Sequence, residues 1–220
     1  MSNRPVTLFT GQWADLELET ICEKVSDWNY DGLELACWGG HVDVEQGAQS
    51  SEFGQNLKET LGQHNLDVWA ISDHLASQLI TGPNDERTDA FAPDELNGDP
   101  EGKREWGKQH LKDAARTASN MCLDVVNGFT GSPLWQWIYP FPPTPQNLVQ
   151  EGFDEFAEEF LPVLDIFAEE EVNFGLEVHT TEIAFDIHTF ERALEAVDHH
   201  PRFGINFDPS HLYWQGVDPV

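Results

Sequence analysis

The sequence predicts an α/β fold built on a parallel sheet, and three observations support this. Short apolar runs rich in β-branched residues alternate with longer amphipathic runs along the chain. The order is strand, helix, strand throughout, which is typical of a parallel sheet. The repeating units have the size found in a (β/α)8 TIM barrel, whose active site lies at the carboxyl ends of its strands. We therefore expect a single barrel domain over residues 1–220, with about six of the eight βα units present.

Hydrophobic period and turn residues place the individual elements. Six apolar runs are expected to be strands, at residues 6–10, 32–37, 67–72, 123–129, 173–179 and 203–208. Five amphipathic runs are expected to be helices, at residues 15–28, 51–64, 102–120, 152–170 and 186–199. Ser50 and Ser51 can cap the second of these helices, and Asp186 the fifth. The fourth helix carries an apolar stripe that predicts a face packed against the sheet: Phe153, Phe156, Phe160, Leu164 and Phe167.

Two connections are too long to be simple links between elements. Residues 81–100 are polar and rich in Gly, Pro and Asp. Residues 131–146 carry aromatic side chains among several prolines: Trp135, Trp137, Tyr139 and Phe141. Long loops of this kind are usually functional or mobile. The aromatic rings suit the apolar faces of sugars, and packing between subunits of a homo-oligomer explains them equally well.

The composition is strongly acidic. The chain has 40 Asp and Glu against 11 Lys and Arg, which gives a formal net charge of −29. With 40% hydrophobic residues it can still fill one large core, so the charge is not that of a disordered tail. Such a surface repels phosphate backbones and anionic membranes, so we expect no nucleic-acid partner and no membrane partner. A halophilic, high-salt cytoplasm explains the charge, because salt screens the repulsion.

The sequence has no secretion signal or disulfide pattern. Residues 1–5 lead directly into the first strand, and no apolar run reaches transmembrane length. Cys22, Cys37 and Cys122 lack metal or redox spacing and are expected to be reduced core residues. We therefore expect a cytoplasmic protein.

Two segments carry the chemistry, because each ends an apolar run in a carboxylate followed by an imidazole. They are residues 175–179, which include Glu177 and His179, and residues 204–211, which include Asp208 and His211. Residues two apart on a strand share a face, so Glu177 and His179 should point the same way. Pro209 biases Asp208 toward an extended conformation, and His211 can then return to the same mouth. This is the residue set of a divalent-metal sugar site; the alternative is that both carboxylates are solvated strand ends.

Further segments occur in a recognisable order with these two. They are Gly32-Leu-Glu-Leu-Ala-Cys-Trp-Gly-Gly-His41, Ile71-Ser-Asp-His74, Gly128-Phe-Thr-Gly131, Leu176-Glu-Val-His-Thr-Thr-Glu-Ile183 and Asn206-Phe-Asp-Pro-Ser-His211. The ordered set resembles the xylose-isomerase-like TIM-barrel superfamily, and within it the sugar phosphate isomerases and epimerases.

This resemblance implies that Glu177 and Asp208 bind a divalent cation, Mn²⁺, Mg²⁺, Co²⁺ or Zn²⁺, and that His211 contacts a substrate oxygen. In that family a His from the seventh strand and a Glu from the eighth complete the metal site. Only residues 209–220 follow Asp208, so both strands are missing from this sequence. We expect a truncated reading of a longer protein. Loss of activity and completion of the site by a partner are the alternatives.

The function implied is isomerisation or epimerisation of a sugar, sugar phosphate or cyclitol by proton abstraction next to a carbonyl. Glu177 is the expected base as well as a metal ligand, and His211 orients the substrate oxygen. Further substrate-binding candidates are His179, His74, His41 and Trp13. The lesser candidates are Glu34, His41, His74 and Glu182. Each of these four also has a structural reading, as a buried hydrogen-bonded or solvated residue.

Two other function classes remain open at this point. An endonuclease-IV-like metal phosphodiesterase belongs to the same superfamily, but this chain has no basic cluster to neutralise phosphates. A non-catalytic binding module that keeps the barrel scaffold is favoured by the missing strands.

Overall fold

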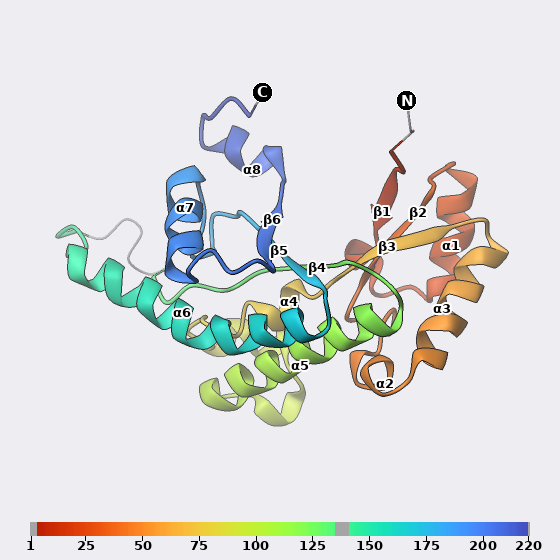
Figure 1. Cartoon of the computed structure of the whole chain (residues 1–220), viewed down its shortest axis with the longest axis horizontal. Helices are drawn as coiled ribbons and strands as arrows, with labels where there is room; N and C mark the ends of the chain where they lie inside the picture. The colour runs from red at the N-terminus through yellow and green to blue at the C-terminus, as the bar shows by residue number, and fades with distance from the viewer. Residues whose placement is uncertain (1–3, 135–140, 220) are drawn as a thin grey trace.

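The computed structural model describes residues 4–134 and 141–219, and its centre is a six-stranded sheet (Figure 1). The strands lie in chain order and every neighbouring pair is parallel. Their bounds are β1 (Thr7–Phe9), β2 (Gly32–Ala36), β3 (Asp67–Ser72), β4 (Val125–Gly128), β5 (Asn173–Glu177) and β6 (Phe203–Asn206). This confirms an α/β fold with part of a barrel. Among the described residues β1 and β6 each have one strand neighbour, so the sheet is open.

Helices follow the strands and cover the outer side of the sheet. The longer ones are α1 (Leu18–Asp27), α3 (Ser51–Gln63), α5 (Pro100–Asn120), α6 (Gln146–Glu169) and α7 (Ile187–Ala196). Figure 1 shows α5 and α6 side by side beneath the central strands, where Arg104 of α5 pairs with Glu155 and Glu159 of α6. The described residues also form three short α-helices and three 3-10 helices: α2 (Val44–Gln49), α4 (His74–Ser77), α8 (Pro209–Trp214), η1 (Gly11–Trp13), η2 (Glu86–Phe91) and η3 (Asp94–Leu96).

The structure corrects several element boundaries. The short helices α2, α4 and α8 were not predicted, because four to six residues are too few to show a helical period. Helix α6 begins at Gln146 rather than Gly152, directly after Pro145. The expected cap at Ser50 makes no side-chain hydrogen bond. The cap at Asp186 is confirmed, because its side chain accepts from the Thr189 backbone N–H in a capping box.

The phenylalanine stripe of α6 forms the centre of the core, as predicted. Its five members are no more than 2% exposed: Phe153, Phe156, Phe160, Leu164 and Phe167. Phe174 of β5 meets the rings of Phe160 and Phe167 at centroid distances of 5.5 and 5.7 Å. Phe203 of β6 stacks on Phe174 at 6.0 Å. This aromatic layer fixes β5 and β6 side by side, so the residues that follow them emerge at the same edge of the sheet.

The far side of β6 is exposed. Ile205 and Phe207 are about half accessible, and Trp214 of α8 is 84% exposed. These side chains lie where a further βα unit would pack in a closed barrel. The exposed apolar surface is therefore a direct consequence of the open sheet.

Three remaining expectations concern segments outside the site. Cys22 and Cys37 are buried, but Cys122 is exposed and lies in the turn after α5 with φ of 52°. Of the aromatic connection, Trp135, Trp137 and Tyr139 lie outside the described residues, while Phe141 is 97% exposed. Among the described residues, no helix has the length and apolar character needed to cross a membrane.

Candidate metal centre and active site

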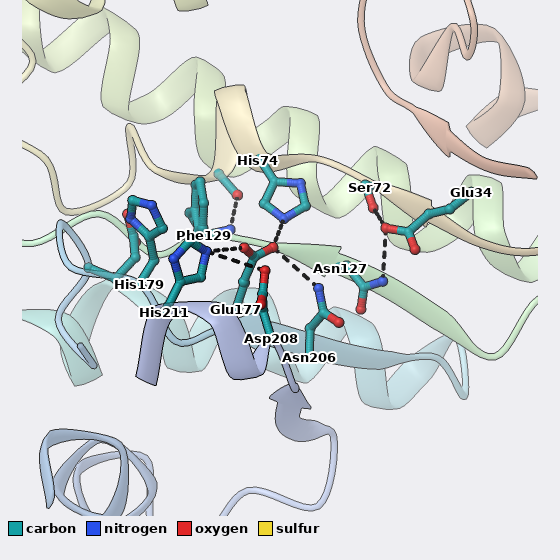
Figure 2. Close-up of polar contacts among 12 residues, drawn as sticks. Glu34, Ser72, His74, Asn127, Phe129, Glu177, His179, Asn206, Asp208 and His211 are labelled. Atoms are coloured by element: carbon teal, nitrogen blue, oxygen red, sulfur yellow. Dashed lines mark hydrogen bonds and ion pairs between the residues drawn. The ribbon is translucent and has the colours of Figure 1, made fainter. Parts of the chain in front are cut away.

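Glu177, the last residue of β5, is the centre of the polar cluster in Figure 2. His74 Nε2 donates to its Oε2 and His211 Nε2 donates to its Oε1, each at 3.0 Å. Asn206 Nδ2 donates to Oε2 at 3.4 Å. Burial alone would raise the pKa of Glu177, but the hydrogen bonds and charges of His74 and His211 outweigh it and hold the pKa below its usual value. The carboxylate is therefore ionised and oriented at neutral pH.

Asp208 and His211 reach the same place from the start of α8. Asp208 is the N-cap, and its Oδ1 accepts from the Ser210 backbone N–H at 2.7 Å. Pro209 occupies the first turn, where its fixed φ favours the helix. His211 lies one turn further on, with Nε2 at 3.5 Å from Asp208 Oδ2. One ligand atom from each of Glu177, Asp208 and His211 lies within 4.8 Å of the others. Atoms this close can share one cation with bonds of about 2.0–2.6 Å.

Aromatic and imidazole rings surround this cluster. His74, the first residue of α4, packs against Phe129 at a centroid distance of 4.6 Å. His179 packs against His211 at 4.3 Å and Phe129 at 5.1 Å. Burial, followed by the nearby charge of His211, lowers the pKa of His179. A neutral His179 ring can exchange hydrogen bonds with substrate hydroxyl groups.

A cavity of about 590 Å³ opens beside Glu177. Glu177, Asp208, His74, Trp38 and Glu34 are among its lining residues, whereas His179 and His211 are not. Its volume lies within the range of small-molecule pockets. The remaining lining residues are Phe9, Gly11, Gln12, Leu75, Phe129, Asn206, Phe207 and Pro209.

Glu34 of β2 faces this cavity, although its position inside a strand gave only a weak signal. The register of β2 against β3 shifts between Leu33 and Glu34, and such an irregularity changes the direction of the side chain. Its Oε1 accepts from Ser72 Oγ and, at 3.1 Å, from Asn127 Nδ2, as Figure 2 shows. The carboxylate is thereby held at the cavity wall.

His41 and Trp13 lie apart from the cluster. Both ring nitrogens of His41 are occupied at 2.9 Å, Nδ1 by Thr10 Oγ1 and Nε2 by the Leu16 carbonyl. The ring is 2% exposed and joins the first two loops. Trp13 packs partly buried against the core and contacts Trp28 at 6.1 Å. Neither His41 nor Trp13 lines the cavity at Glu177. The nearby residues Gln12 and Trp38 line it instead.

Glu182 has a structural position beside the site. Its Oε2 accepts from the backbone N–H groups of Thr130 and Gly131 at 2.7 and 2.6 Å. Burial raises the pKa of this carboxyl to about 7 against the opposing effect of these hydrogen bonds. Glu182 thus joins the loop after β5 to the loop after β4, which carries Phe129.

Sequence reasoning missed Asn206, Phe129 and Trp38. Asn206 lies two residues before Asp208, and alternation along β6 would have pointed to it. Phe129 follows β4 directly, at the carboxyl end of the strand. No local signal distinguishes Trp38 from a packing residue.

Comparison with known proteins assigns the sequence to a family. The family model described as xylose isomerase-like TIM barrel matches residues 22–220. The chain belongs to this family. A curated relative, the uncharacterised protein YfiH of Bacillus subtilis, is 23% identical over 96% of the chain and 66% of its own length. The chain therefore spans just under two thirds of that relative.

Solved structures show the same xylose isomerase-like fold. They include the "probable 3-DHS dehydratase AsbF" of Bacillus anthracis, at 19% identity and a TM-score of 0.65 over 98% of this chain and 67% of that one. The 3-keto-D-glucoside 4-epimerase YcjR of E. coli is 10% identical, with a TM-score of 0.66 over 98% of this chain and 72% of that one. A Mycobacterium smegmatis protein of the same fold, solved with magnesium, is 13% identical, with a TM-score of 0.61 over 94% of this chain and 65% of that one. At these identities the likeness establishes the fold.

Proposed function

We propose that this xylose isomerase-like chain acts in a divalent-metal-dependent isomerase or epimerase of a sugar, sugar phosphate or cyclitol. The observation that carries the proposal is the convergence of Glu177, Asp208 and His211, whose ligand atoms lie within 4.8 Å of one another. Two of the three, Glu177 and Asp208, line a cavity. The 3-keto-D-glucoside 4-epimerase and the magnesium-bound protein of the same fold support this class of reaction.

The three side chains fit a divalent cation. Two carboxylates and one imidazole suit Mn²⁺, Co²⁺ and Zn²⁺, while Mg²⁺ prefers the oxygen donors. When bound, the ion would act as a Lewis acid toward the carbonyl and neighbouring hydroxyl oxygens of an open-chain sugar. His74 hydrogen-bonds to Oε2 of Glu177 and so orients the carboxylate. Residues that hydrogen-bond to metal ligands commonly have this role.

Glu177 is also the proposed base for the proton next to the substrate carbonyl. Its lowered pKa keeps it ionised at neutral pH. A carboxylate within about 3 Å of the reacting C–H can accept the proton. His211 contacts Glu177 and packs on His179, so these two imidazoles would orient substrate oxygens beside the proposed metal ligands. Phe129, which lines the cavity, would shield the reacting carbon from water.

The excess of acidic over basic residues argues against a phosphodiesterase that acts on nucleic acid. Phosphate-backbone binding depends on clustered Lys and Arg, and this chain has 11 basic residues against 40 acidic ones. A small carbohydrate is the proposed ligand.

The test combines metal binding with proton exchange. Mn²⁺ is titrated into the wild-type chain, Glu177→Gln and Asp208→Asn, with free Mn²⁺ followed by electron paramagnetic resonance. Solvent deuterium incorporation into fructose, psicose and tagatose is followed by NMR. We expect each site variant to weaken Mn²⁺ binding by roughly tenfold or more, and Glu177→Gln to abolish exchange.

The matched control is Glu158→Gln, an exposed Glu-to-Gln change on α6 that should leave both measurements unchanged. Unchanged Mn²⁺ affinity in Glu177→Gln contradicts the metal site. Specific Mn²⁺ binding without exchange of any of these sugars supports the non-catalytic binding module instead.

A further inference from the structure

A second cavity lies beside the one at Glu177. It has a volume of about 380 Å³, and Trp38 and Leu75 line both cavities. The two cavities therefore adjoin each other at these two residues. The proposed reaction uses none of the residues found only in the second cavity.

The second cavity contains a buried acid–imidazole pair. Asp73, between β3 and α4, is 1% exposed. Its Oδ1 and Oδ2 lie 3.0 and 3.1 Å from Nδ1 of His110 on α5. Because Nδ1 faces Asp73, the remaining hydrogen-bonding atom of the ring is Nε2, and no described residue hydrogen-bonds to it. His110 thus offers Nε2 to a ligand while Asp73 fixes the orientation of the ring.

The other walls of this cavity are apolar. The Trp106 ring packs on His110 at a centroid distance of 4.7 Å, and Phe91 and Trp38 add two further aromatic surfaces. Among the lining residues Asp73 and His110 form an acid–base pair, and burial raises the pKa of the third ionisable group, the Cys37 thiol, well above its usual value. An anionic group would find no unpaired cation here, and burying a charge without a partner is costly. The cavity therefore favours an uncharged ligand that has both apolar faces and hydroxyl groups.

The outer wall comes from the long connection before α5, and a buried lysine fixes it. Lys103 is 0% exposed, pairs with Asp89 and donates to the carbonyls of Asn84 and Asp85 at 3.3 and 3.1 Å. These contacts hold the segment that contains Ala90 and Phe91. A polar segment of this length thus forms an ordered wall.

We propose that the second cavity is a distal subsite, which binds an uncharged second sugar ring of a glycoside whose reacting sugar occupies the cavity at Glu177. This rests on the proposed function. Aromatic rings pack on the apolar faces of a sugar, and the Asp73–His110 pair supplies hydrogen bonds to its hydroxyl groups. Each cavity has a volume typical of a small-ligand pocket.

Calorimetry on the chain with MnCl₂ tests the subsite. The probes are cellobiose, maltose, lactose and sucrose, compared with glucose, fructose and glucose 6-phosphate. We expect at least one disaccharide to bind about tenfold more tightly than its component sugars, equivalent to ~1.4 kcal/mol. Trp106→Ala, which removes a wall, and Ala90→Phe, which adds bulk at the rim, should each remove this gain without changing monosaccharide binding.

Trp28→Ala, a tryptophan outside both cavities, should keep the gain. Equal affinities for disaccharides and monosaccharides, or a gain that survives in both cavity variants, overturns the subsite. Tighter binding of glucose 6-phosphate than of every disaccharide overturns its preference for an uncharged ring. Failure of the proposed function is separate, because it appears as unchanged Mn²⁺ affinity in Glu177→Gln. Ala90→Phe should leave Mn²⁺ affinity at the wild-type value.

Discussion

His211 Nε2 lies 3.0 Å from Oε1 of Glu177, although the two residues come from different βα units. The same nitrogen is 3.5 Å from Oδ2 of Asp208. One imidazole thus connects the carboxylates that end two consecutive units of the barrel. A local motif cannot create this arrangement; it requires β5 and β6 to be parallel and adjacent.

Removing this imidazole should change the titration of Glu177. His74 and His211 together hold the pKa of Glu177 below its usual value, against the effect of burial. In His211→Ala one donor and one positive charge are lost, so the pKa should rise toward that of an ordinary glutamate. Carbon-13 NMR of the side-chain carboxyl across pH 3–7 measures it. His188→Ala, an exposed histidine of α7, is the control. An unchanged pKa in His211→Ala would show that the contact is electrostatically unimportant.

Glu182 should make the protein less stable as the pH rises from about 4.5 to about 7. Its pKa is about 7 in the folded chain and near 4.5 when unfolded, so the native state binds the additional proton. The stability this provides is complete below about pH 4.5 and is lost as the pH rises to about 7. Glu182→Gln stays neutral and should not lose this stability. Between pH 4.5 and 7 the difference in free energy of unfolding between variant and wild type should therefore shift by about 1–3 kcal/mol in favour of the variant. Urea unfolding at pH 4.5, 6 and 7.5 measures the difference, and parallel curves contradict the prediction.

The core position of Phe160 gives a direct test of the α6 packing. Its ring is fully buried against Phe156 and Phe174. Phe160→Ala should cost about 3–5 kcal/mol, the usual loss for a buried Phe-to-Ala change. Phe141→Ala, at a position 97% exposed, should change stability by less than about 0.5 kcal/mol. Chemical denaturation of both variants checks this, and equal stabilities would mean that the stripe does not carry the core.

The net charge predicts a strong dependence of stability on salt. A formal charge of −29 repels itself in the compact state, and salt screens that repulsion. The melting temperature should therefore rise steeply between 0.1 and 3 M KCl. Parallel melts in sucrose, which strengthens burial without screening charge, separate the two effects. A melting temperature independent of KCl would remove the high-salt interpretation.

The amino-acid sequence determined the elements whose signal is local. Apolar runs and their spacing predicted all six strands in the correct order, and steps of three and four predicted the buried face of α6. The sequence also predicted that Glu177 and Asp208 lie together, because the carboxyl ends of neighbouring parallel strands meet at one edge. It did not predict the helices α2, α4 and α8, because so few residues show no helical period.

Tertiary structure decided which histidines join the cluster. His41 and His74 each follow a strand, and the sequence treats them alike. In the fold both nitrogens of His41 are taken by Thr10 and Leu16, while Nε2 of His74 reaches Glu177, 103 positions away in the chain. The pairing of Asp73 with His110 on α5 is also long-range. Hydrogen-bond partners that are distant in sequence leave no periodic trace along the chain, so only the packing of strands and helices could assign them.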